Sequence, residues 1–210
     1  MQIQGIDALF RQLQSPAGIA VTVAALLVVL IAVLVVINRR KTADMRLLKK
    51  TITKHSEAVE RDAVISDGLD GFLFVDYLLL LRGKIVAMKV LSKRGYIFGD
   101  EKIDEWTCVE NNRTEKFSNP LADVRLCAQQ LRHALEFDAV EPSVLFGRQS
   151  EFPKGVPEGV LRLAHLDEKL DALKGSEDAD EVARQAWAQL IAMVHKDRQA
   201  LGEIIRPDPD

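Results

Sequence analysis

The chain has 210 residues, of which 48% are hydrophobic and 28% charged, so it is long and apolar enough to build a folded domain with a core. This composition excludes a disordered chain and a collagen-like repeat. The formal net charge of −3 hides an uneven distribution of charge along the sequence. The two cysteines, Cys108 and Cys127, are too few for a disulfide framework or a four-cysteine zinc site, and we expect both to be reduced thiols.

The first predicted element is an apolar helix. Residues 17–37 carry no charge, and Thr22 is the one polar side chain among them. As a helix at about 1.5 Å per residue this run is roughly 31 Å long, which matches the hydrocarbon core of a bilayer. A signal peptide would have a shorter apolar core followed by a small-residue cleavage site. We therefore predict a transmembrane helix at 17–37, preceded by a short extracytoplasmic tail at 1–16.

The charges beside this run predict its orientation. Residues 38–54 form a basic juxtamembrane stalk with a net charge of +6, whereas residues 1–37 sum to zero. The positive-inside rule places the stalk and all that follows in the cytoplasm, which agrees with reduced thiols. We expect a single-pass protein of the cell membrane with its N-terminus outside and the lipid bilayer as a partner. Residues 55–210 then carry −9, which disfavours nucleic acid as a partner because phosphate binding needs clustered cations.

The remaining elements follow in chain order. Thr42 can cap a helix that continues to Arg61. Two apolar runs at 72–81 and 84–91 predict a buried β-hairpin whose turn is Arg82-Gly83. We expect further strands at 96–98, 105–110, 113–117 and 142–146, helices at 121–137, 158–173 and 178–201, and a disordered tail at 206–210. The side chains expected on the buried face of the last helix are Val182, Ala186, Leu190, Ile191 and Val194.

This order of elements is that of the restriction-endonuclease-like fold, an α/β fold with a mixed sheet flanked by helices. Short segments add to the likeness: Val75-Asp76, KIVAMK at 84–89, GYIFG at 95–99, Trp106-Thr107, and FSNPL at 117–121 ahead of a helix. This series resembles the nuclease-related domain (NERD) family over residues 55–160, with C-terminal helices following at 161–205.

The resemblance implies a site of the PD-(D/E)xK type, in which two carboxylates hold Mg²⁺ and a lysine assists the attacking water. Asp76 matches the first acid and the metal ligand, and Lys89 matches the lysine. Ala87 stands where the second acid belongs. We expect Asp76 and Lys89 to remain as a structural ion pair.

Other family positions also differ here. Tyr77 follows Asp76 where the family usually has histidine, and Asp123, Val124 and Cys127 stand where it often has Gln-Asn and a histidine. Some relatives of the fold supply an acid from the first helix, and Glu57 and Glu60 are the candidate replacement acids. A solvated helix face is the simpler interpretation of both.

Three functions are compatible with these residues. The first is a membrane-anchored pseudo-nuclease that binds an unknown protein partner or acts as a scaffold, with no cofactor. The second is a metal-dependent nuclease acting on DNA or RNA, which would use Mg²⁺ and a displaced catalytic acid. The third is a nucleic-acid sensor that binds without cutting, against which the −9 of residues 55–210 counts. The first is the function that we expect.

Overall fold

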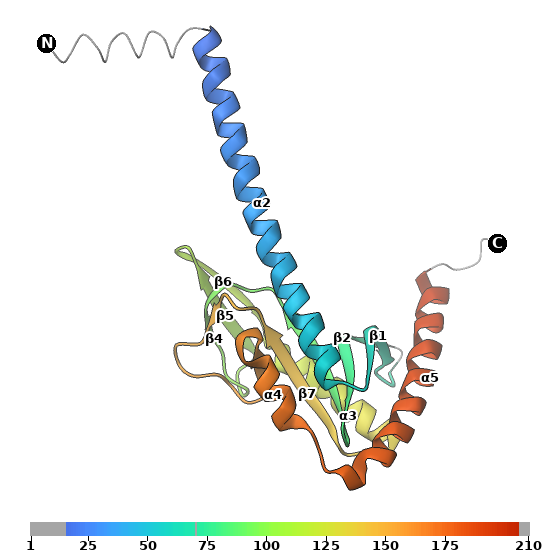
Figure 1. Ribbon diagram of the computed structural model, residues 1–210. Coiled ribbons are helices and arrows are strands. Elements are labelled where there is room, and N and C mark those ends of the chain that lie inside the picture. The colour runs from blue at the N-terminus through green and yellow to red at the C-terminus, as the bar shows by residue number, and fades with distance from the viewer. Residues whose placement is uncertain (1–15, 70, 206–210) are drawn as a thin grey trace, which may run out of the picture. The chain divides into compact units, whose positions relative to one another are not determined.

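The structure is a computed structural model that describes residues 16–69 and 71–205 (Figure 1). Apart from Pro16, the predicted tails at 1–16 and 206–210 lie outside these described residues. The chain divides into two units, Met1–Arg46 and Leu47–Asp210.

The described part of the first unit is a single helical segment, which makes up most of helix α2 (Pro16–His55). Helix α2 is continuous, so the predicted apolar helix and the predicted stalk helix are one element. The described large side chains between Val23 and Ile31 are 50–69% exposed. Counted over the described residues, no helix is both long and apolar enough to cross a membrane.

The second unit is built around a mixed five-stranded sheet in the order β1-β2-β3-β7-β9. Its strands are β1 (Ala58–Ser66), β2 (Phe72–Leu81), β3 (Lys84–Leu91), β7 (Val140–Phe146) and β9 (Val160–Arg162). The first three strands are antiparallel, whereas β3, β7 and β9 run parallel. The predicted hairpin is confirmed, with Tyr77 opposite Met88 and Leu81 opposite Lys84.

A second sheet has four strands in the order β6-β5-β4-β8, where we had expected a single sheet. These strands are β4 (Gly95–Phe98), β5 (Glu105–Glu110), β6 (Arg113–Ser118) and β8 (Ser150–Glu151). Asn111 and Asn112 join β5 to β6 with φ angles of 48° and 60°. Two positive φ angles at the centre of a two-residue loop are typical of a type I′ turn, which asparagine tolerates.

Helices cover both faces of the five-stranded sheet. On one face, helices α3 (Pro120–Leu135) and α5 (Asp180–Ile205) bury leucine, valine and alanine side chains, together with Trp106 from the second sheet. On the other face, Leu48 and Ile52 of α2 pack with Leu166 and Leu170 of α4 (Leu166–Leu173). Because both faces are covered, β2 and β3 are apolar at nearly every position rather than at every second one.

Three sequence predictions about elements are wrong. The helix expected to reach Arg61 ends at His55, and β1 follows it. The segment 158–173, which we expect to be one helix, contains strand β9, a 3₁₀ turn, η1 (Leu163–His165), and only then helix α4. Another 3₁₀ turn, η2 (Glu177–Ala179), precedes α5. Val182 is 55% exposed, because the buried stripe of α5 runs through Ala183, Ala186, Leu190 and Val194.

The alternation of side chains between the two faces of the sheet is interrupted at one point in strands β1 and β2. Val75 and Leu78 belong to the same core, although side chains three positions apart on a regular strand point to opposite faces. The register contains Arg61 opposite Tyr77 and Ala63 opposite Val75, but no pair between Asp62 and Asp76. Asp62 has a φ of 49°. The sheet is therefore irregular at Asp76, where the family resemblance places an acid.

Candidate functional site

Asp76 lies half-buried in β2 at the irregular position of the sheet. Its carboxylate oxygen Oδ2 accepts a hydrogen bond of 2.5 Å from the backbone N–H of Val90 in β3. The backbone pairing of β2 with β3 ends at Tyr77 and Met88. Beyond that pair, the Asp76 side chain takes the place of a backbone acceptor for β3. One of the two carboxylate oxygens is thus engaged by the neighbouring strand.

Lys89 of β3 contacts an acid that the sequence prediction did not assign to it. Its Nζ lies 2.7 Å from Oδ2 of Asp123 in the first turn of α3. The expected ion pair between Asp76 and Lys89 is therefore wrong, since the lysine is paired with Asp123. The Lys89 side chain is 31% exposed, so its ammonium group is only partly removed from water.

Helix α3 presents Asp123 through its N-terminal turn. Asn119 caps the helix by accepting a hydrogen bond from the Leu121 N–H at 2.9 Å, and Pro120 occupies the first helical turn. An acid in this turn also interacts favourably with the helix dipole. The sequence contains this signal, but it does not indicate which strand lies beside the helix.

Ala87 occupies the position where the resemblance requires the second acid. It is 0% exposed and lies in the same core as Ile85, two residues away on the strand. Its partners in the neighbouring strands are Leu78 and Pro142. Side chains two residues apart on a strand point to the same face, so Ala87 shares its face with Ile85 and Lys89. At position 87 that face is buried in the core.

The two candidate replacement acids both contact helix α5. Glu57 lies in the bend between α2 and β1, and its Oε2 is 3.0 Å from Nε of Arg184. Glu60 lies in β1, and its Oε1 is 2.8 Å from a guanidinium nitrogen of Arg198. Neither acid is on the first helix as predicted, because that helix ends at His55.

These residues do not fit a two-carboxylate magnesium site. Mg²⁺ requires octahedral oxygen ligands, usually including one or two carboxylates. Asp76 has one oxygen bonded to Val90, position 87 has a methyl group, and Asp123 is bonded to Lys89. Within the described residues, no group of three or more histidine, cysteine, aspartate or glutamate side chains has metal-binding geometry.

The two cysteines are free and buried. Burial raises the pKa of the Cys127 thiol to about 12. Burial also raises the pKa of Cys108, although nearby Lys93 partly opposes the shift. Both are therefore thiols of low reactivity rather than nucleophiles.

A polar cluster that the sequence did not predict joins the end of α2 to α4. His55 is buried, and its Nε2 lies 2.9 Å from Oδ1 of Asp167, which also contacts Nζ of Lys54 at 2.8 Å. The Nδ1 of His55 is 3.6 Å from Asp171. The bonds from Lys54 and His55 lower the pKa of Asp167. The cluster fixes the last turn of α2 against α4.

Comparison with known proteins identifies a family for this chain. The model of the nuclease-related domain matches residues 39–147, just over half of the chain. No curated protein and no solved structure matches the chain significantly. The matched range contains Asp76, Lys89 and Asp123, and it ends with strand β7. The chain therefore belongs to the nuclease-related domain family.

Proposed function

We propose that this chain is a single-pass membrane protein whose nuclease-related domain, with a restriction-endonuclease-like fold, faces the cytoplasm and binds a protein partner without cleaving nucleic acid. The observation that carries the proposal is the fully buried Ala87 at the position of the second acid. A site of the family type needs a second carboxylate on this strand, and only a methyl group is present.

The remaining polar groups support the same proposal. Lys89 is held by Asp123, Asp76 accepts the Val90 N–H, and the two replacement candidates contact arginines of α5. Each of these four acids already has one carboxylate oxygen engaged in a hydrogen bond within the domain, and the Lys89 ammonium group is bound to one of them. Ion pairs between partly exposed side chains such as these contribute about 0–1 kcal/mol each. The contacts therefore favour a structural role.

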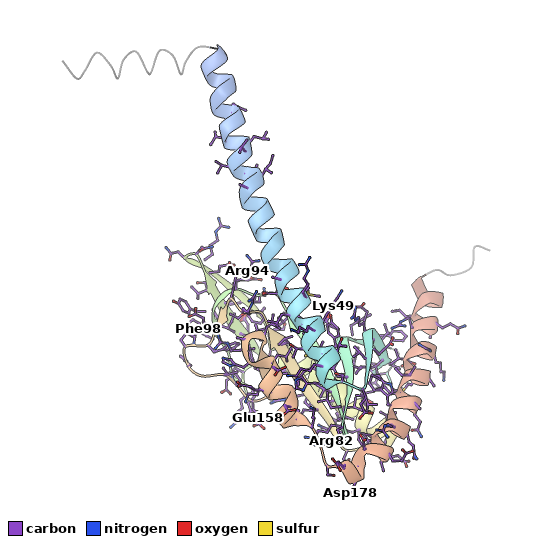
Figure 2. The ribbon with its side chains drawn as sticks, viewed as in Figure 1. Lys49, Arg82, Arg94, Phe98, Glu158 and Asp178 are labelled. Atoms are coloured by element: carbon purple, nitrogen blue, oxygen red, sulfur yellow. The ribbon has the colours of Figure 1, made fainter. Side chains whose placement is uncertain are left out.

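The membrane anchor is supported by the apolar run at 17–37 and by the exposure of its described side chains (Figure 2). Leu26, Val28 and Val29 are 69%, 64% and 59% exposed on a continuous helix. Removing a leucine or valine side chain fully from water contributes about 1.5–3 kcal/mol, so a lipid environment would stabilise this helix strongly. The +6 of residues 38–54 supports the cytoplasmic orientation of the domain.

Metal binding tests the non-catalytic proposal. We expect the melting temperature of the full-length protein to stay the same when Mg²⁺ or Mn²⁺ is added, because a ligand stabilises a protein only if it binds the folded state. A concentration-dependent rise in melting temperature that Asp76→Ala removes would overturn the proposal. Asp62→Ala is a control for the loss of a neighbouring carboxylate at the same irregularity.

Topology is tested separately. A reporter fused after Asp210 should behave as cytoplasmic, and a cysteine introduced near residue 205 should resist impermeant reagents in intact cells. Labelling of that cysteine from outside would contradict the orientation.

One observation favours the alternative, a metal-dependent nuclease with a displaced acid. Asp123 lies 2.7 Å from Lys89, so an acid is present beside the lysine even though Ala87 is not one. If the alternative holds, Asp123→Asn will abolish a cleavage activity that the wild-type protein possesses. The proposal predicts that there is no such activity to abolish.

A further inference from the structure

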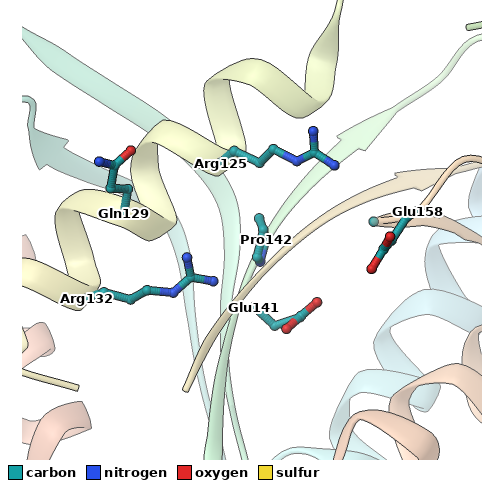
Figure 3. A pocket seen from close by; sticks show the side chains of 7 residues that line it. Arg125, Gln129, Arg132, Glu141, Pro142 and Glu158 are labelled. Carbon is teal, nitrogen blue, oxygen red and sulfur yellow. The ribbon is translucent and has the colours of Figure 1, made fainter. Parts of the chain in front are cut away.

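A pocket of about 360 Å³ lies between helix α3, strand β7 and the segment before β9 (Figure 3). Asp76, Lys89 and Asp123 are not among the residues that line it. The residues that line it are Arg125, Gln129, Arg132, Glu141, Pro142, Glu158 and Gly159. Its volume is within the range of small-molecule sites, roughly 300–1,000 Å³.

One wall of the pocket is a face of α3. Arg125, Gln129 and Arg132 are four and three residues apart, which places their side chains on the same side of the helix. Arg125 forms an ion pair with Glu101 at 2.8 Å, so its charge is balanced. Arg132 donates from one guanidinium nitrogen to the Val140 carbonyl at 2.5 Å, and its buried Nε has no hydrogen-bond partner.

The opposite wall carries two carboxylates. Glu141 is half-buried in β7, and Glu158 is exposed in the segment before β9. Figure 3 shows both on the other side of the pocket from the α3 side chains. Among the described residues, neither glutamate has an ion-pair or hydrogen-bond partner. The two walls have opposite charges that are not paired with each other.

The unbalanced charges define the chemistry of a complementary ligand. Arg132 is one cation without a carboxylate partner, and Glu141 and Glu158 are two anions without a cation. A simple anion would be repelled by the two glutamates, and a simple cation would leave the Arg132 guanidinium group without an anionic partner. A molecule with one carboxylate and two cationic groups satisfies both walls at once. Free basic amino acids have this combination of charges.

We propose that this pocket binds a free basic α-amino acid, arginine or lysine, with its carboxylate at Arg132 and its cationic groups at Glu141 and Glu158. Gln129 also lines the pocket. Binding at this pocket does not require a metal or catalysis at Asp76 and Lys89, so its test is independent of the test of the proposed function.

Calorimetric titration of the full-length protein, purified in a mild detergent, with L-arginine and with L-lysine tests the proposal. We expect saturable binding by at least one, with a Kd of about 1 mM or tighter, as suits a ligand of this size. Agmatine lacks the carboxylate and should bind roughly tenfold more weakly or worse. Nα-acetyl-L-arginine resembles the C-terminal arginine of a protein and lacks the α-ammonium group, so it should also bind more weakly.

Variants locate the site. Glu158→Gln removes an exposed carboxylate without disturbing a structural contact, and it should weaken arginine binding roughly tenfold. Glu110→Gln changes an exposed glutamate at the β5–β6 turn and should leave binding unchanged. The proposal is overturned if neither amino acid binds saturably, if agmatine or the acetylated ligand binds equally well, or if Glu158→Gln has no effect.

Discussion

Replacing Ala87 by glutamate would restore the acid-x-Lys pattern of the sequence, and its effect on stability depends on whether position 87 faces an open site or a closed core. Ala87 is 0% exposed and lies between Leu78 and Pro142 in the neighbouring strands. The structure therefore predicts that Ala87→Glu is destabilising and that it creates no metal site.

The magnitude follows from two contributions. Forcing a longer side chain into a packed core costs about 1–3 kcal/mol. Burying a carboxyl group without a partner costs at least a similar amount, even when it becomes protonated. We expect a total of about 4 kcal/mol. For a domain of this size each 1 kcal/mol lowers the melting temperature by about 2–4 °C, so the variant should melt about 10 °C lower.

Thermal unfolding of wild type, Ala87→Glu and Ala87→Gln, each with and without Mg²⁺, is the assay. The glutamine variant adds nearly the same volume without an ionisable group, so the difference between the two variants reports the cost of the carboxyl group. That difference should shrink as the pH falls, because the glutamate of the unfolded chain then becomes protonated as well and the unfolded state loses the free energy of ionisation in water. A glutamate variant as stable as wild type, or one that Mg²⁺ stabilises, would refute the reasoning.

Three further predictions concern other parts of the domain. Arg198→Ala should lower the free energy of unfolding by about 1–2 kcal/mol in urea titrations, because its guanidinium group donates hydrogen bonds to Glu60 and to two β1 carbonyls. An effect no larger than that of Arg113→Ala at the exposed start of β6 would contradict a stabilising role of these bonds. Cys127 should resist alkylation in the folded protein and react on unfolding, as mass spectrometry can measure, since burial raises its pKa to about 12; rapid native labelling would be the opposing result. Asp167 has a lowered pKa, so its contribution to stability should be complete above about pH 4 and lost as the pH falls below that value. Urea unfolding across this pH range should show a smaller acid loss in Asp167→Asn than in wild type, and equal losses would argue against the cluster.

The β-hairpins were predictable because their signals are local. The apolar runs of β2 and β3 are separated by Arg82-Gly83, and Gly83 adopts the positive φ of 65° that its turn requires. The turn at Asn111 and Asn112 is equally local. Strand β1 was not predictable, because Ile52, His55 and Val59 have helical spacing and the strand contains three consecutive charged residues at 60–62. The carboxylate of Glu60 pairs with Arg198 of α5, which is far away in the sequence.

The sequence indicates which positions belong to the candidate site, but it does not indicate which side chains contact one another there. The resemblance selected Asp76, Ala87 and Lys89, and all three lie on the paired strands β2 and β3. The partner of Lys89 depends on how α3 packs against β3, which no local pattern encodes. The sequence marks Asp123 as a departure from the family pattern, but it does not indicate that Asp123 lies beside Lys89. The pairing of Glu57 with Arg184 likewise requires the tertiary placement of α5.

The central claim, that this nuclease-related domain does not cleave nucleic acid, is tested most directly by incubating the purified full-length protein with DNA and with RNA in the presence of Mg²⁺ or Mn²⁺. Wild type, Asp76→Ala, Lys89→Ala and Asp123→Asn should be indistinguishable from one another and from a protein-free control. Metal-dependent cleavage by wild type that is lost in Asp76→Ala and in Asp123→Asn would contradict the claim and identify these two acids as the catalytic pair.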